Sequence, residues 1–257
     1  MHPAVARDHR EILIKTYQEL FDQRGSAYDR AMRRYPDARR QEFEQAVAAA
    51  GLGPGMVVAD VPAGGGYLQA YLPPGCTCLG HEPCASFTNH GAVAGQPAQL
   101  LPLPWGRASV DAAISLAGVH HLDDKRPLFS ELRRVVRPGG RLVVSDVATA
   151  SAVARFLDGY VGVHNSTGHE GAFLDERTLR ELAEAGWAVE RAAIRDFQWV
   201  FPDRTAMAVF CHELFDLRSC SLADTQAAIE DQLGVSTLAN GRTAMHWSLM
   251  TISARLA

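Results

Sequence analysis

The chain has 257 residues, of which 47% are hydrophobic and 21% are charged. A chain of this length buries roughly three quarters of its unfolded surface on folding, so it needs neither a metal nor a disulfide for stability. Its composition excludes a disordered protein, and its formal net charge of −4 gives it no general attraction to nucleic acid or anionic membranes.

Residues 1–13 mix charged and apolar side chains, and no apolar signal core follows them, which argues against secretion. The most apolar stretch, residues 142–157, contains Asp146 and Arg155 and is too short to span a bilayer. The five cysteines match no common zinc-binding spacing, and their odd number indicates reduced thiols. We therefore expect a cytoplasmic protein that does not act at a membrane and has no metal site.

The expected elements begin with helices and continue as alternating strands and helices. Residues 5–50 are predicted to be helical, with a break at Gly25 and Ser26 and a second helix over residues 38–50. The glycine-rich segment 51–55 leads into an apolar strand at 56–61. Further strands are expected at residues 78–81, 110–115, 141–147, 189–197 and 247–254.

Helices are expected between these strands. One carries an apolar stripe from Leu128 to Val136 and ends at residues 138–140 (Pro-Gly-Gly), and another begins at the N-cap Asp175 and ends before Gly186. Residues 203–240 depart from the alternation and are predicted to be a helical pair, the second helix starting with a capping box at residues 221–224. Strands alternating with helices predict an α/β protein whose mostly parallel sheet has helices on both faces.

We expect a single domain over residues 1–257. It comprises an N-terminal helical segment (1–55), a core (56–200 and 241–257) and a helical insertion or cap (203–240). Insertions of this kind commonly cover a ligand site.

The strongest candidate for a binding site is the turn Val61-Pro62-Ala63-Gly64-Gly65-Gly66 after the first strand. Glycine is favoured where the backbone approaches a ligand closely, and a helix beginning there offers free N–H groups. Glu82 follows the second strand, 22 positions after Asp60, where an acid accepts hydrogen bonds from ribose hydroxyls. A dinucleotide fingerprint would need a third glycine at the position of Gln69, so a nicotinamide cofactor is the weaker alternative.

These residues and four later segments resemble the class I S-adenosylmethionine-dependent methyltransferases. The family's Asp-x-Gly-x-Gly-x-Gly loop corresponds to Asp60, Pro62, Gly64 and Gly66, with Pro62 replacing the first glycine. The later matches are the segments 96–102, 110–115, 120–122 and 132–140. The resemblance implies a Rossmann-like sheet and S-adenosyl-L-methionine as cofactor. It also implies a set of cofactor-binding residues: Tyr28, Asp60, Pro62, Ala63, Gly64, Gly66, Glu82, Pro83, Ala98, Gln99 and Ala117.

The residues expected near the acceptor are histidines. The resemblance implies that the end of the strand before His120 faces the transferred methyl group, where a base is needed if the acceptor arrives protonated. His164 and His169 lie in a predicted loop with Tyr160, Asn165, Ser166 and Glu170, which lines the substrate pocket in one interpretation and faces solvent in another. A metal at His164, His169 and Glu170 is the less favoured interpretation.

Nucleic acid is not expected as the substrate. The arginines between residues 30 and 40 are interspersed with acids, which is typical of a solvated helix face, and the segment after the strand at 110–115 lacks the Asn/Asp-Pro-Pro-Tyr motif of base methylation. The sequence therefore predicts methyl transfer to an oxygen or nitrogen of a small metabolite, by a monomer or homodimer. The alternatives are a catalytically degenerate cofactor-binding protein and a nicotinamide-dependent oxidoreductase.

Overall fold

The computed structural model describes residues 17–88 and 99–256. Its centre is a seven-stranded sheet in the order β2-β1-β3-β4-β7-β5, with β6 paired to β7. β1 runs parallel to β2 and β3, and β3 runs parallel to β4, whereas β7 is antiparallel to β4, β5 and β6. The strands are β1 (Val57–Asp60), β2 (Thr77–Gly80), β3 (Val110–Leu116), β4 (Val136–Asp146), β5 (Trp187–Phe201), β6 (Val235–Thr237) and β7 (Thr243–Leu256).

All six strands expected from the sequence are present, and β4, β5 and β7 are longer than expected. The extra residues include the large hydrophobic Trp199 and Phe201 of β5 and Met245 of β7, and the antiparallel pairing of β5 with β7 continues through them. Residues 138–140, expected only to end a helix, belong to β4.

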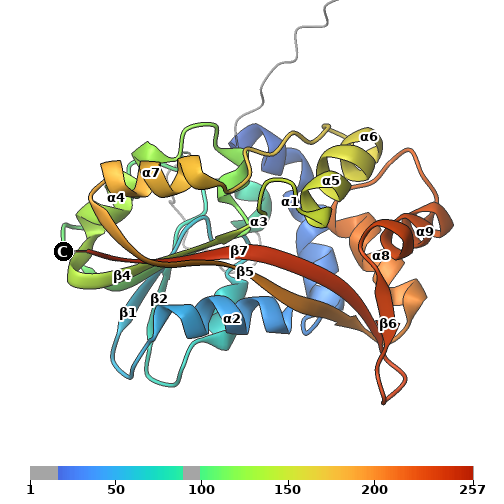
Figure 1. The fold of residues 1–257 in the computed structure, drawn as a ribbon, viewed down its shortest axis with the longest axis horizontal. Coiled ribbons are helices and arrows are strands. Elements are labelled where there is room, and N and C mark those ends of the chain that lie inside the picture. The colour runs from blue at the N-terminus through green and yellow to red at the C-terminus, as the bar shows by residue number, and fades with distance from the viewer. Residues whose placement is uncertain (1–16, 89–98, 257) are drawn as a thin grey trace, which may run out of the picture.

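Helices cover both faces of the sheet, as the sequence predicts. In Figure 1 the sheet is seen nearly edge-on, with α2 on one side and α4 and α7 on the other. α2 contacts β3, β4, β5 and β7, whereas α4 packs on β4 and α7 on β5. The helices are α1 (Tyr17–Arg34), α2 (Arg40–Ala50), α3 (Ala85–Thr88), α4 (Arg126–Val135), α5 (Ala152–Phe156), α6 (Gly162–His164), α7 (Glu176–Glu184), α8 (Arg204–Leu214) and α9 (Leu222–Gln232).

The predicted break at Gly25 is wrong, because α1 runs through it without interruption. A Cβ atom added to Gly25 would lie 2.1 Å from Oγ of Ser86 in α3. The Ser86 hydroxyl donates a hydrogen bond to the carbonyl of Phe21, 2.6 Å away. Gly25 therefore allows α1 and α3 to pack closely. The neighbouring sequence does not distinguish a glycine with this role from one that ends a helix.

The helix expected to start at the glycine turn is also absent. Residues 67–71 form only a short 3₁₀ turn, and residues 64 and 66 reach positive φ values of 52° and 75°. The expectation that a helix beginning there offers free N–H groups to the ligand is therefore wrong, and the glycines act through backbone shape alone.

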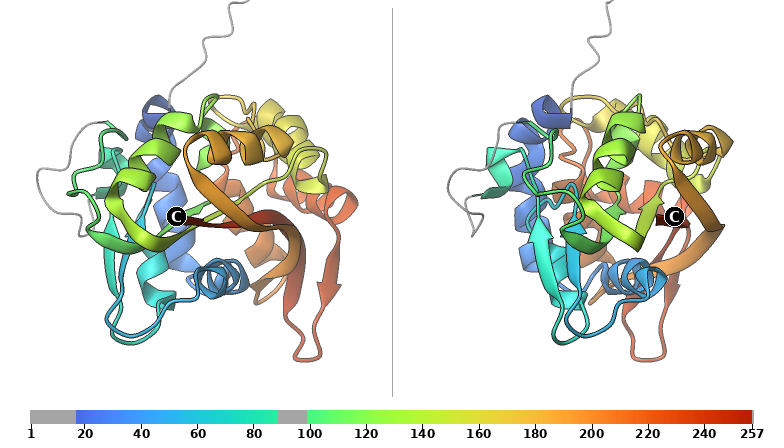
Figure 2. Two further views of the ribbon diagram at one scale, coloured as in Figure 1. Left: turned by 60° about the vertical axis from the view of Figure 1, so that its left-hand side comes forward. Right: turned by 90° about the vertical axis from the view of Figure 1, so that its left-hand side faces the viewer.

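The inserted helical pair is confirmed between β5 and β7. Asp203 caps α8, and Ser221 and Asp224 form the predicted capping box at the start of α9. α8 packs against both α9 and α1, so the insertion meets the N-terminal helix far from it in sequence. Both views in Figure 2 show the β6–β7 hairpin projecting from the body of the molecule. Across the residues that the structure describes, no helix combines the length and apolar character needed to cross a membrane.

Candidate active site

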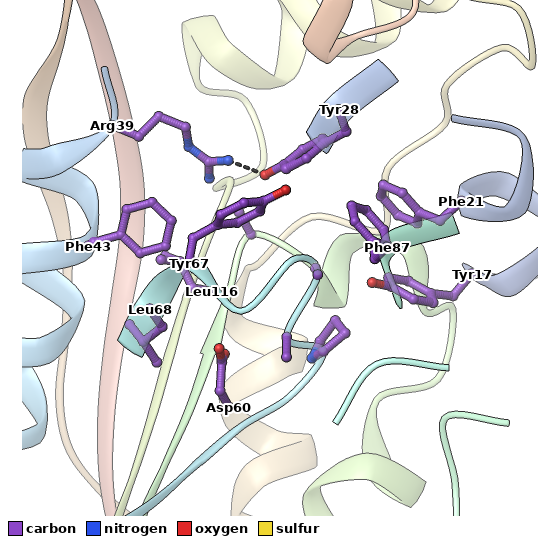
Figure 3. A pocket seen from close by; sticks show the side chains of 15 residues that line it. Tyr17, Phe21, Tyr28, Arg39, Phe43, Asp60, Tyr67, Leu68, Phe87 and Leu116 are labelled. Carbon is purple, nitrogen blue, oxygen red and sulfur yellow. Dashed lines mark hydrogen bonds between the residues drawn. The ribbon is translucent and has the colours of Figure 1, made fainter. Parts of the chain in front are cut away.

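The glycine turn and the ends of β1 and β3 form one wall of a cavity of about 480 Å³. Six of the residues expected to bind the cofactor line it: Tyr28, Asp60, Pro62, Ala63, Gly64 and Ala117. The other wall comes from the N-terminal helices and α3, as Figure 3 shows for the rings of Tyr17, Phe21, Tyr28, Phe43 and Phe87. The structure thus brings most of the predicted cofactor residues to one place.

The aromatic lining was not predicted, apart from Tyr28. Tyr28 stacks on Tyr67 with 6.1 Å between ring centroids, and Phe87 meets Tyr28 edge to face at 5.6 Å. The hydroxyl of Tyr67 donates to Asp29, 2.8 Å away. Helical periodicity predicts only that such aromatic residues are buried, so the sequence carries no signal that they line a cavity.

Asp60 is the acidic group of this cavity, and its side chain rises into it in Figure 3. It is only 3% exposed. Burial, and then the nearby negative charge of Glu82, raise the pKa of its carboxyl to about 8. A cationic amino group beside Asp60 would relieve both effects, so this cavity fits a ligand that carries an ammonium or sulfonium charge.

Glu82 lies behind the glycine turn and is not among the residues that line the cavity. Its carboxylate accepts hydrogen bonds from the Tyr17 hydroxyl at 2.9 Å, the Gly64 amide at 2.8 Å and the Cys84 amide at 2.9 Å. Burial raises the pKa of Glu82, and these hydrogen bonds oppose that rise. Glu82 therefore fixes the turn to α1, and its contact with ribose stays a prediction.

The remaining cofactor candidates lie beside the cavity or outside the described chain. Gly66 precedes the 3₁₀ turn, Pro83 is buried next to Glu82, and the carbonyl of Gln99 lies 3.3 Å from the His81 imidazole. Ala98 falls outside the described residues. The expected contacts of these residues with the cofactor therefore stay predictions.

A second cavity, of about 530 Å³, adjoins the first and shares Phe21, Tyr28, Arg39 and Ala117 with it. Most of its remaining walls are aromatic or aliphatic side chains from the sheet and the helical insertion: Val147, Leu157, Trp199, Leu214, Phe215, Trp247 and Leu249. Trp199 and Trp247 stack with 4.3 Å between ring centroids. The polar members of its lining are Arg24, Arg39, Glu42, His120, His121 and His169.

His120 lies in a 3₁₀ turn (Val119–His121) that follows β3 and is held by Asp146 at the end of β4. Its Nδ1 lies 2.7 Å from Oδ1 of Asp146, and its backbone amide donates to Oδ2 at 3.0 Å. Asp146 is completely buried, which by itself raises its pKa, but the charge interaction and hydrogen bonds with His120 and the Val147 amide lower it. An ionised Asp146 keeps the hydrogen of the His120 ring on Nδ1 and leaves Nε2 as an acceptor.

His121 and His169 approach His120, and metal-binding atoms of the three lie within 4.8 Å of one another. Nδ1 of His169 lies 2.8 Å from Oδ1 of Asp158, which belongs to a π-helical turn at Leu157–Val161. Burial is the main cause that lowers the pKa of both His121 and His169, and the charge of Arg24 adds to it. The same guanidinium opposes a metal cation here, so we treat the three imidazoles as the polar end of the second cavity.

His164, by contrast, does not join His169. It ends α6, and its Nδ1 lies 3.0 Å from the Ser219 hydroxyl, away from the linings of both cavities. The expectation of a loop is wrong for Tyr160 and His164, because both lie in helical turns. The set His164, His169 and Glu170 is therefore not supported as a metal site, and His169 lies instead beside His120 and His121.

Arg39 was expected on a solvated helix face, and this expectation is wrong. Arg39 is 3% exposed and forms an ion pair with Glu42, which is 1% exposed. It also donates to the Tyr28 hydroxyl, as drawn in Figure 3, while Glu42 accepts from the Trp199 indole at 2.8 Å. The Arg-x-x-Glu spacing followed by Phe43 is the sequence signal that could have indicated a buried pair.

Arg24 is as buried as Arg39 but has different surroundings. It is 4% exposed, and its Nε and Nη1 have no hydrogen-bond partner within the described parts of the chain. Burial lowers its pKa to about 10, and the charge of Asp216 partly offsets this. Nothing in the sequence distinguishes Arg24 from the other arginines of the N-terminal helices.

Comparison with known proteins finds similarity to methyltransferases. A family model described as "Methyltransferase domain" matches residues 59–144. An O-methyltransferase of Aspergillus sclerotiorum is 34% identical over 114 residues, which cover 41% of this chain and 40% of that protein. The chain therefore spans less than half the length of this relative.

A longer match is the demethylmenaquinone methyltransferase of Mycolicibacterium paratuberculosis. It is 29% identical over 167 residues, or 55% of this chain and 71% of that protein. Among solved structures, geranyl diphosphate C-methyltransferase from Streptomyces coelicolor, in complex with Mg²⁺, geranyl diphosphate and S-adenosyl-L-homocysteine, superposes with a TM-score of 0.55. That match covers 90% of this chain and 84% of that one at 14% identity, so it concerns the fold alone.

Proposed function

We propose that this chain, which belongs to the class I S-adenosylmethionine-dependent methyltransferases, transfers a methyl group to an oxygen or nitrogen atom of a small molecule. S-adenosyl-L-methionine would occupy the first cavity and the acceptor the second. The observation that carries the proposal is that the two cavities meet at Ala117, beside His120, where donor and acceptor would face each other.

The first cavity suits the cofactor in charge and shape. The buried Asp60 carboxyl would meet the cationic amino group, and residues 63–66 bring backbone rather than side chains to the ligand. Gly118 is needed for the same shape, because a Cβ atom there would lie 2.6 Å from the Pro62 ring. When bound, the cofactor would supply a methyl group on a sulfonium sulfur, and the neutral thioether S-adenosyl-L-homocysteine would be the leaving group of an in-line displacement.

The chain's own contribution is to orient the acceptor and to take its proton. The Asp146 carboxylate holds Nδ1–H of His120, so that Nε2 is free to accept a proton from an acceptor hydroxyl. The aromatic rings of the second cavity exclude water from the line between acceptor and methyl group. A hydroxyl acceptor gains most from this arrangement, because an oxygen nucleophile is activated by losing its proton.

The apolar character of the second cavity favours a small, largely hydrophobic acceptor over a nucleic acid. The O-methyltransferase relative supports oxygen as the acceptor atom. All five cysteines carry free thiols, which supports our proposal of a cytoplasmic enzyme. Assembly as a homodimer remains part of the proposal.

The test measures binding and turnover separately. Calorimetric titration with S-adenosyl-L-homocysteine should show one site per chain, and release of this product should be detected when a panel of hydroxylated aromatic compounds is added with S-adenosylmethionine. Binding without turnover across the panel would favour the degenerate cofactor-binding protein. Binding of a dinucleotide in place of the adenosyl cofactor would favour the oxidoreductase.

A further inference from the structure

Two arginines of equal burial line the second cavity, and only one of them has its charge neutralised within the described structure. The guanidinium of Arg39 makes two hydrogen bonds to the Glu42 carboxylate, at 2.8 and 2.5 Å. Arg24 leaves Nε and Nη1 without a partner among the described residues, although it is 4% exposed. A buried charge without a partner destabilises a protein substantially, so its retention calls for a ligand.

Among the described residues, the surroundings of Arg24 supply no alternative partner. Its guanidinium carbon lies 5.7 Å from the centroid of the Phe21 ring, which neutralises no charge. Asp216 is close enough to raise the pKa of Arg24, but its carboxylate is already engaged by the Ser166 hydroxyl and by Arg218. The guanidinium therefore borders the cavity as a free cationic group.

We propose that Arg24 binds an anionic group of the methyl acceptor, and that the acceptor is a small aromatic carboxylic acid. One unpaired guanidinium matches one negative charge, which favours a carboxylate over a phosphate. The stacked Trp199 and Trp247 and the ring of Phe215 suit a planar, apolar body. The inference deepens the proposed function and rests on it, because the acceptor is taken to occupy the cavity that holds His120.

A stability comparison tests the unpaired charge without any ligand. Arg24→Met keeps the size and removes the buried charge, and Arg39→Met is the matched control that leaves Glu42 buried and unpaired. We expect the melting temperature of the ligand-free protein to rise by about 2 °C or more for Arg24→Met and to fall by at least as much for Arg39→Met. A fall for both variants would show that Arg24 is neutralised within the protein and would overturn the proposal.

A binding comparison tests the carboxylate. Trp199 and Trp247 line the cavity, so quenching of tryptophan fluorescence reports its occupation. The probes are 3- and 4-hydroxybenzoate and the corresponding neutral hydroxybenzamides, each titrated in the presence of S-adenosyl-L-homocysteine. We expect the acids to bind at least tenfold more tightly than the amides to the natural protein, and the preference to vanish in Arg24→Met.

Equal affinity for acids and amides, or a preference that survives in Arg24→Met, would overturn the proposal. A tenfold loss of S-adenosyl-L-homocysteine affinity in Arg24→Met with acid binding unchanged would also overturn it, because Arg24 would then bind the carboxylate of the cofactor instead of that of the acceptor. None of these readouts needs turnover. Acid binding without methyl transfer would therefore refute the proposed function and leave the anion site standing.

Discussion

Nδ1 of His120 lies 2.7 Å from Oδ1 of Asp146, a carboxylate with no solvent exposure at the end of the neighbouring strand. The pair resembles in its geometry the oriented imidazole of many acid–base catalysts, in which the acid fixes the tautomer and the imidazole takes the proton. Because β3 and β4 are adjacent and parallel, the turn that follows β3 lies beside the end of β4, which brings His120 close to Asp146.

Replacing the proposed base, His120, should lower the rate of methyl transfer without weakening cofactor binding. We expect His120→Gln to reduce kcat roughly 10²- to 10⁴-fold, with S-adenosyl-L-homocysteine affinity unchanged. Its residual activity should rise with pH, as the acceptor hydroxyl ionises without help. His164→Gln is the control, and it should retain full activity because His164 borders neither cavity. Equal losses in the two variants would contradict the role of His120.

Asp60 makes cofactor binding depend on pH. Its pKa is about 8 in the folded chain against an ordinary value of 3.8, so below pH 8 a cationic ligand must displace a proton. The affinity for S-adenosyl-L-homocysteine should therefore increase as pH rises from 6 to 8 and then level off. Calorimetry in buffers of different ionisation enthalpy should detect about one proton released per ligand at pH 7. Binding without proton release would show that Asp60 is already ionised.

The same group should also affect stability. Between pH 3.8 and about 8 the folded chain holds a proton on Asp60 that the unfolded chain releases, so the free energy of unfolding falls as pH rises through this interval. Asp60→Asn removes this effect, and we expect its melting temperature at pH 7 to exceed that of the natural protein. The gain should shrink toward pH 4, and thermal unfolding at the two pH values provides the measurement.

Glu82 and Tyr17 provide a matched pair for locating the ribose. We expect Glu82→Ala to weaken cofactor binding by more than tenfold, because a ribose contact and the anchor of the Gly64 amide are lost together. Tyr17→Phe removes only one hydrogen-bond donor to the Glu82 carboxylate and should not weaken cofactor binding. Isothermal titration of both variants checks this, and unchanged affinity in Glu82→Ala would mean that the ribose lies elsewhere.

Gly25 should tolerate no side chain. A methyl group there would strike Ser86, so Gly25→Ala should destabilise the protein by about 1–3 kcal/mol in denaturant unfolding. Gly159→Ala is the matched control, since a Cβ atom at this helical glycine meets nothing within 4 Å and should stabilise the protein slightly. Combining Gly25→Ala with Ser86→Gly should restore part of the loss.

The sequence predicts the parts of this molecule that are governed by local pattern. The strands, the N-cap Asp175, the capping box at Ser221, and the glycine turn after Asp60 all follow from short-range signals and are confirmed. Arg39 and Gly25 were misinterpreted because their roles depend on partners that chain topology brings near. Trp199 and Trp247 meet the N-terminal helices only through the folding of β5 and β7 against α2 and α8, which no spacing in the sequence encodes.

The sharing of α1 by both cavities has a thermodynamic consequence. Phe21 and Tyr28 lie on this one helix and border both spaces, so a ligand that shifts the helix alters both at once. Such coupling is reciprocal: whatever factor the donor adds to the acceptor's affinity, the acceptor adds to the donor's. If that factor exceeds one, binding of either ligand would raise the occupancy of the other site.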